Sequence, residues 1–168
     1  MKKIIHIIDS ITDWVGKLAS WLILFLIFTL VYEVISRHLF NKPTFWSYDL
    51  SYMLGGAAAF LGIAWVQRNK GHVRVDIFYE RLSERNRALV DLTLTLLLLL
   101  PLMTVAFLNS AEAAMISWIR GETASGAWRP PIYPLKTVIP LAILLVIMQG
   151  ISEIFKNILT LLGRGEEL

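Results

Sequence analysis

Hydrophobic residues in this chain gather into long unbroken runs, and they do not alternate with polar residues. A helix needs about 20 apolar residues to cross a bilayer, and four runs come close to that length. Because lipid leaves backbone groups without partners and the runs are continuous, we expect four transmembrane helices and not a barrel. The expected spans lie at about 18–35, 50–66, 88–107 and 135–154.

The segments outside these runs predict two further helices. Near the N-terminus, apolar residues recur from Ile4 to Leu18 with a helical period, while Asp9 and Asp13 fall largely on the other side. This pattern predicts an amphipathic interfacial helix at about 3–16. A second, short interfacial helix is expected between spans 2 and 3, within 67–87. The predicted fold is an all-α integral membrane protein whose residues 1–168 form a single four-helix domain.

Composition and charge agree with a membrane protein and indicate its orientation. The chain is 56% hydrophobic and lacks cysteine, which excludes disulfides and thiolate metal sites. One side of the expected topology, with both termini and the middle loop, holds 11 of the 16 Lys and Arg residues; the other holds 5. The positive-inside rule therefore predicts cytoplasmic N- and C-termini. The net charge is only +3 and no basic tract is present, so nucleic-acid binding is not expected.

An acid within the first hydrophobic run, Glu33, is followed four residues later by Arg37. On a helix this spacing, with the acid first, favours an ion pair. An acid inside a span is also a candidate for direct transport. Because Glu33 lies near the outer end of its span, we prefer a structural pair or a subunit interface, and a transport role stays open. Trp46 and Asp49 open span 2, as an interfacial anchor and an acid near the helix N-terminus, and both are candidates for the same structural or subunit interface.

Two other groups of residues are candidate contact surfaces. Small residues in span 2 are spaced for close helix packing, either within the chain or against another subunit; they are Gly55, Ala58, Ala59 and Gly62. The loop before span 4 combines aromatic, proline and basic residues, which predicts either an outer docking loop or a stiff turn in an aromatic belt. Its members are Trp128, Arg129, Pro130, Pro131, Tyr133 and Lys136.

The motifs of soluble enzymes are missing from the sequence. It contains no phosphate-binding glycine loop, no serine nucleophile elbow and no HExxH. His72 and Asp76 are four residues apart, but no third ligand lies nearby to complete a metal site. We therefore expect no catalytic residues, no cofactor and no metal; a small membrane enzyme would need a catalytic cluster that the sequence does not contain.

The segment SRHLFNKPTFWSYDLSY, followed about 20 residues later by GHVRVD, resembles the DctQ-type small membrane subunit of tripartite ATP-independent periplasmic (TRAP) transporters. His38 stands where the family has tyrosine, and Tyr48 and Asp49 stand where it has two glutamates. The chain length, the four spans and the inside termini also agree. The matching positions are Arg37, Phe40, Asn41, Trp46, Asp49, Gly71, His72, Val73, Val75 and Asp76.

The resemblance implies a scaffold subunit of the bacterial inner membrane. Such a subunit lies among membrane lipids and pairs with a large elevator-type membrane subunit. A periplasmic binding protein delivers an organic acid, such as a C4-dicarboxylate or sialic acid, and an ion gradient, often of sodium, drives its import. The resemblance places Arg37 and Asn41 near other subunits and makes GHVRVD a cytoplasmic motif. The alternative is an independent carrier, like the small multidrug-resistance proteins, that uses Glu33.

Overall fold

The computed structural model describes residues 2–69 and 82–162, and helices make up most of them. Three of the helical segments, between residues 84 and 120, follow one another without a break and form one rod, so the described residues form four helical rods. Each rod is long and apolar enough to cross a membrane, as the sequence predicts. The helices are α1 (Lys2–Leu39), α2 (Ser47–Arg68), α4 (Glu84–Leu94), the π-helical segment η1 (Thr95–Leu99), α5 (Leu100–Arg120) and α6 (Tyr133–Leu161).

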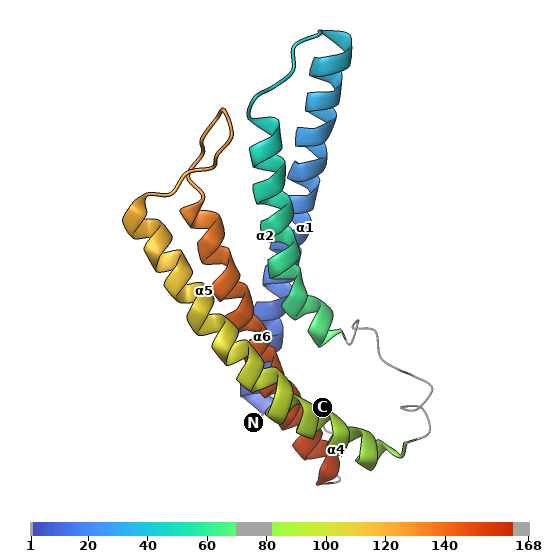
Figure 1. The fold of residues 1–168 in the computed structure, drawn as a ribbon. Helices are drawn as coiled ribbons and strands as arrows, with labels where there is room; N and C mark the ends of the chain where they lie inside the picture. Colours follow the sequence, from blue (N-terminus) through green and yellow to red (C-terminus); the bar gives the residue numbers. More distant parts are fainter. Residues whose placement is uncertain (1, 70–81, 163–168) are drawn as a thin grey trace.

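The helices form two antiparallel pairs, α1 with α2 and α5 with α6 (Figure 1). The pairs meet at the end of the molecule that carries residues 2 and 162, here called the terminal end. They diverge toward the hairpin end, which carries the loops 40–46 and 121–132. Helix α6 is central, because it packs against α1, α2, α4 and α5. In the most apolar stretch of α6, 33% of the residues are buried inside the molecule, whereas in that of α1 only 6% are buried.

Helix α1 differs from the expectation of two separate elements. A surface helix at about 3–16 and a span at about 18–35 were expected, but one helix runs unbroken from Lys2 to Leu39. No proline interrupts it, and Gly16, at the expected boundary, packs against Trp65 of α2. The polar stripe that predicted a surface helix instead contacts α6 and α2 through Asp9, Thr12 and Asp13. The N-terminal segment is therefore continuous with the helix of the first span.

The third rod is longer than the expected span at 88–107, because it continues to Arg120. Ser83 caps its start by accepting a hydrogen bond from the Asn86 amide at 3.4 Å. The structure has a π turn immediately before Pro101, in which the Leu100 amide donates to the Thr95 carbonyl. Proline lacks an N–H and its ring crowds the preceding turn, and one wide turn relieves that conflict.

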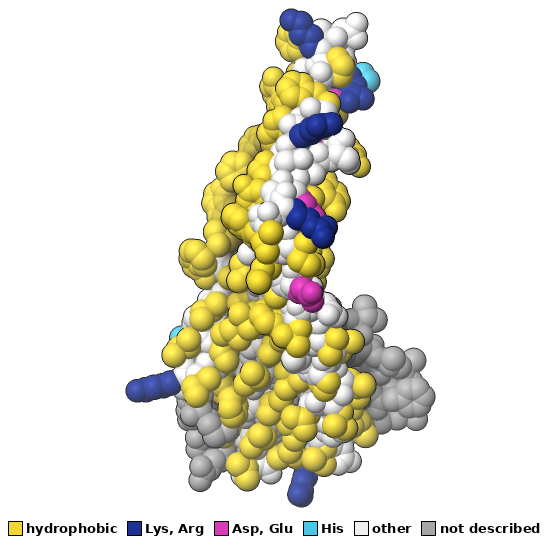
Figure 2. Space-filling view, turned by 60° about the vertical axis from the view of Figure 1, so that its left-hand side comes forward, with side chains coloured by type: hydrophobic (Ala, Val, Ile, Leu, Met, Phe, Trp, Pro, Cys, Tyr) yellow, Lys and Arg dark blue, Asp and Glu magenta, His cyan; other side chains and the backbone are white. Residues whose placement is uncertain are grey.

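Hydrophobic side chains cover most of the face seen in Figure 2, and basic side chains are spaced along the narrow arm at the top. Exposed side chains on α1 and η1 include Phe25, Phe28, Leu97 and Leu98. Such a surface does not suit water, so the chain is a multi-pass membrane protein whose outer faces meet lipid or another protein.

Two predictions fall in the part of the chain that the structure does not describe. The short helix expected within 67–87 would occupy mainly residues 70–81, since α2 ends at Arg68 and α4 begins at Glu84. The GHVRVD segment lies in the same gap, with its candidate residues Gly71, His72, Val73 and Asp76.

Candidate interaction surface

Glu33 is the centre of a polar cluster at the hairpin end. Its Oε1 accepts hydrogen bonds from Nε of Arg37, at 2.8 Å, and from a second guanidinium nitrogen. Its Oε2 accepts from the backbone N–H of Thr44, at 3.0 Å, and from the Thr44 hydroxyl. Glu33 is buried, whereas the Arg37 side chain is 59% exposed. Both carboxylate oxygens are therefore occupied by groups of the same chain.

The turn that brings Thr44 back to Glu33 depends on Asn41. Asn41 has a φ of 51°, in the left-handed region that asparagine tolerates better than most residues. The reversal lets the Lys42 N–H donate to the Ser36 carbonyl at 3.0 Å, and the Ser36 hydroxyl donates to the Lys42 carbonyl at 2.6 Å. These bonds satisfy groups at the end of α1 that the helix leaves free.

Trp46 packs against α1 just below this turn. Its ring stacks on Tyr32 with centroids 5.7 Å apart and planes inclined by 29°. Offset aromatic stacking of this kind adds to the free energy gained from burial. The loop from 40 to 46 is thus attached to α1 at two points, through Thr44 and through Trp46.

The second loop of the hairpin end, residues 122–132, is a small hairpin. The Ala124 N–H donates to the Pro130 carbonyl at 2.8 Å, and the Ile132 N–H donates to the Glu122 carbonyl at 3.0 Å. Arg129 turns the chain with a φ of 49°. Pro131 pairs with Thr123 across the hairpin. The prolines therefore stiffen a defined hairpin that exposes Trp128 and Arg129.

Glu122 fixes this hairpin to the two helices that it joins. It accepts hydrogen bonds from Lys136 of α6 and, at 2.7 Å, from the Ser117 hydroxyl of α5. The hydrogen bond from Lys136 and then that from Ser117 hold the pKa of Glu122 below its ordinary value. Nearby, Trp118 donates to the Thr137 hydroxyl at 2.8 Å and lies against Tyr133, with ring centroids 4.2 Å apart.

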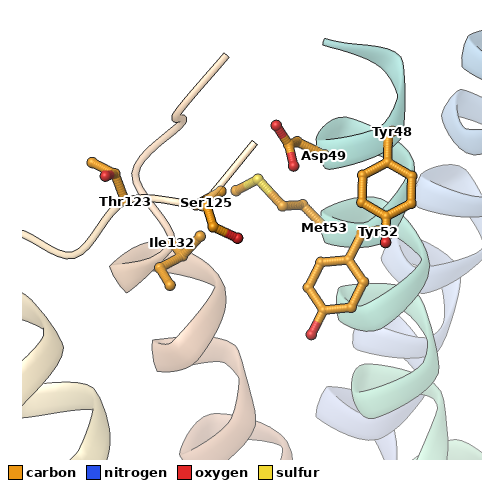
Figure 3. Close-up of a pocket in the computed structure, with 8 residues that line it drawn as sticks. Tyr48, Asp49, Tyr52, Met53, Thr123, Ser125 and Ile132 are labelled. Atoms are coloured by element: carbon orange, nitrogen blue, oxygen red, sulfur yellow. The ribbon is translucent and has the colours of Figure 1, made fainter. Parts of the chain in front are cut away.

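A cavity of about 370 Å³ lies between part of this hairpin and the start of α2. Figure 3 shows Asp49 and Met53 of α2 on one side, with Ser125 and Ile132 on the other. Asp49 is 7% exposed. It lies against Gly126, where an added Cβ would be 2.5 Å from a carboxylate oxygen. Tyr48 and Tyr52 complete the α2 wall.

The small residues of α2 do not all face neighbouring helices. The position of a Cβ on Gly55 would be 3.7 Å from Leu26 of α1, and Ala58 is buried. In contrast, Ala59 is exposed, and nothing lies within 4 Å of the corresponding position at Gly62. Two of the four predicted packing residues therefore leave α2 open to a neighbour outside the described part of the chain.

A polar network at the terminal end centres on Asp9, which sequence reasoning placed on a solvated helix face. One carboxylate oxygen accepts from Gln149 and Ser152, both at 3.2 Å, and the other accepts from Lys156 at 2.7 Å. Gln149 and Ser152 are fully buried. Arg68 of α2 approaches the same carboxylate at 3.7 Å. Asp9 thus ties the start of α1 to the end of α6 and to α2.

Two further contacts widen this network, since Arg68 pairs with Asp13 and the buried Thr12 hydroxyl donates to Gln149 at 3.2 Å. The network had a signal in the sequence. Asp9, Thr12 and Asp13 follow a helical stripe, as do Gln149, Ser152 and Lys156 near the other end of the chain. Pattern alone does not say which two stripes meet, because that depends on tertiary packing. The sequence analysis did not predict a role for Glu122 either, because Glu122 lies in a loop and belongs to no helical stripe.

Metal ligands do not cluster in the part of the chain that the structure describes, where no three His, Cys, Asp or Glu residues converge. A family model described as "Tripartite ATP-independent periplasmic transporters, DctQ component" matches residues 26–160. No curated protein matches the chain. The matched region begins before the Glu33 cluster and ends within α6, so it includes both surfaces of the hairpin end.

Proposed function

The chain belongs to the DctQ family of small TRAP-transporter subunits, and we propose that it is a scaffold that holds the large membrane subunit in place. The family is a transporter component and not an enzyme, and its members operate with a large membrane subunit and a periplasmic binding protein. As such a scaffold, this chain lies in the inner membrane of a bacterium, with its terminal end in the cytoplasm. The imported substrate is an organic acid, and an ion gradient drives its import.

The occupancy of Glu33 is the observation that supports a scaffold over an independent carrier. A carrier that used this acid would need a carboxylate free to bind a proton or a substrate. Here one oxygen is held by Arg37 and the other by Thr44, and all donors come from the chain itself. Glu33 therefore fixes the loop 40–46 to α1, which is a structural role and not a transport role.

The distribution of polar groups supports the same function. The networks around Glu33 and Glu122 lie at the hairpin end, and the Asp9 network lies at the terminal end. The long apolar stretches between them are little buried. Only 6% of the most apolar stretch of α1 and 11% of that of α4–α5 are buried inside the molecule. Such faces are suited to a membrane partner, with lipid covering the remainder.

The test is transport by the purified chain with and without the large subunit. Liposomes that contain only this chain, loaded with a sodium or proton gradient, should take up neither organic acids nor cationic dyes. Liposomes that also contain the large subunit, supplied with the binding protein, should take up an organic acid. Robust uptake by the chain alone would show that it is a carrier and contradict the scaffold function.

A further inference from the structure

Asp49 differs from the other two acids of the hairpin end in having no partner. Glu33 is bound by Arg37 and Thr44, and Glu122 is bound by Lys136 and Ser117. Asp49 is as deeply buried as Glu33, yet among the residues that the structure describes none donates a hydrogen bond to it or forms an ion pair with it. Its oxygens are not among the enclosed side-chain atoms that lack a partner, so the carboxylate reaches the cavity beside it and is open to a donor from outside the described part of the chain.

The cavity beside Asp49 offers room for the missing donor. Its volume of about 370 Å³ is many times the roughly 30 Å³ that one water occupies in the liquid, so the end of a long side chain fits. Asp49 is the third residue of α2, where the helix dipole favours a negative charge. The dipole supplies no hydrogen atoms to the carboxylate oxygens, which can accept two or more donors each.

The walls of the cavity indicate the type of side chain that it would accept. Tyr48 and Tyr52, one helical turn apart on α2, are 80% and 68% exposed. Aromatic rings favour a neighbouring cation, and tyrosine is enriched where proteins meet. Ser125 adds a hydroxyl from the hairpin wall. A single carboxylate is too few ligands for a bound metal ion, whereas one guanidinium or ammonium group matches its charge.

We propose that this cleft receives a lysine or arginine side chain of the large membrane subunit, which pairs with Asp49. This inference rests on the proposed scaffold function. The membrane subunit is the partner, rather than a soluble protein, because the exposed aromatic wall belongs to the spanning helix α2. On the hairpin side, Gly126 packs directly against Asp49.

The first experiment measures assembly and stability in parallel with Asp49→Asn. The chain is purified in mild detergent, and its affinity for the separately purified large subunit is measured. We expect affinity to fall at least about tenfold, as when one member of a desolvated charge pair is removed. The melting temperature of the isolated chain should not fall by more than about 2 °C below wild type, because Asp49 has no partner there to lose. Glu112→Gln, which removes an exposed acid of α5, is the control and should change neither quantity.

The second experiment identifies the donor. The chain lacks cysteine, so Ser125→Cys can be labelled at one site with a benzophenone maleimide and photo-crosslinked in the assembled complex. The adduct should fall on a peptide of the large subunit near a lysine or arginine. Replacing that residue by glutamine should reproduce the effect of Asp49→Asn, and exchanging the two charges should restore assembly.

Three outcomes would overturn the inference. If Asp49→Asn binds the large subunit as tightly as wild type, Asp49 forms no ion pair with that subunit, and the scaffold function still stands. Adducts only on the periplasmic protein or on lipid show that the cleft has another occupant. If the wild-type chain itself fails to bind the large subunit, the scaffold function fails and the inference fails with it.

Discussion

At the scale of single residues, the acids of this chain are distinguished by what occupies their oxygens. The spacing of Glu33 and Arg37 predicted their pairing, because four residues make one helical turn. The part played by Thr44 could not be predicted in the same way. It reaches Glu33 only because Asn41 reverses the chain, and a left-handed asparagine leaves no periodic trace in the sequence.

Removing Arg37 should destabilise the chain more than removing Glu33. In Arg37→Gln the buried Glu33 carboxylate loses its cation, whereas in Glu33→Gln the Arg37 side chain, 59% exposed, can turn to water. Thermal unfolding of the detergent-solubilised chain should therefore give the lower melting temperature for Arg37→Gln.

The double variant gives the control for this pair. Glu33→Gln with Arg37→Gln should be about as stable as the worse single variant, or more stable, because the two residues share one interaction. Lys42→Gln, which removes an exposed cation on the same loop, should have no effect. Strictly additive losses from the two changes would show that the residues act independently.

Acid should loosen the hairpin at residues 122–132 through Glu122. Its hydrogen bonds to Lys136 and Ser117 lower its pKa in the folded state below the ordinary 4.5. The stabilisation is therefore complete above pH 4.5 and is lost as pH falls below that value through the folded pKa. A nitroxide on Ala127→Cys should become more mobile in this acid range. In Glu122→Gln the label should be mobile at neutral pH already, and its mobility should not change in that range.

At the scale of elements, the sequence predicted the four spans because uninterrupted apolar runs leave a helix as the one solution in lipid. It did not predict where helices join. The polar stripe from Asp9 to Asp13 suits a water-facing surface, but it suits a buried interface equally well when α6 supplies complementary groups. The π turn before Pro101 could not be predicted either, since proline disfavours a regular turn without specifying its replacement.

Alanine at two glycines should affect the stability of the chain differently. A Cβ on Gly16 would lie 2.6 Å from the ring of Trp65, where α1 crosses α2. Crowding of this kind costs about 1–3 kcal/mol, against roughly 1 kcal/mol gained from the better helix propensity of alanine. Gly62→Ala meets no atom within 4 Å and should retain that gain. Thermal unfolding of the isolated chain should thus show a loss for Gly16→Ala and no loss for Gly62→Ala.

The same pair of variants also tests what covers α2. If Gly62 faces the large subunit, Gly62→Ala should weaken assembly while leaving the isolated chain as stable as before. An unchanged affinity for the large subunit would place this face of α2 against lipid.

At the scale of the whole molecule, the two ends differ: polar contacts hold the helix pairs together at the terminal end, and the pairs diverge at the hairpin end. The two helix pairs meet where Asp9 binds α6 and α2, and they separate where the cavity beside Asp49 lies (Figure 1). In the scaffold function proposed above, the terminal end would be held rigid and the hairpin end would be offered to partners. The resemblance to known transporter subunits implied the function, but it did not identify the network that holds this end together.

Removing the charge of Asp9 should therefore loosen the whole bundle. Asp9→Asn deprives Lys156 and Arg68 of a shared carboxylate, and we expect a loss of about 1–3 kcal/mol in the free energy of unfolding. The loss is smaller than for a fully buried pair because Lys156 is 31% exposed and can reach water. Asp13→Asn is the matched control, since Asp13 is 42% exposed and should contribute about 0–1 kcal/mol.

Lys156→Met separates a charge effect from a packing effect. If Asp9 acts mainly by neutralising Lys156, Asp9→Asn with Lys156→Met should recover part of the stability that Asp9→Asn loses, because no unpaired charge remains beside Gln149 and Ser152. The measurement is thermal unfolding in one detergent for all four variants. Losses below about 1 kcal/mol from both Asp9→Asn and Asp13→Asn would show that the terminal end is held by apolar packing, and that the network contributes little to its rigidity.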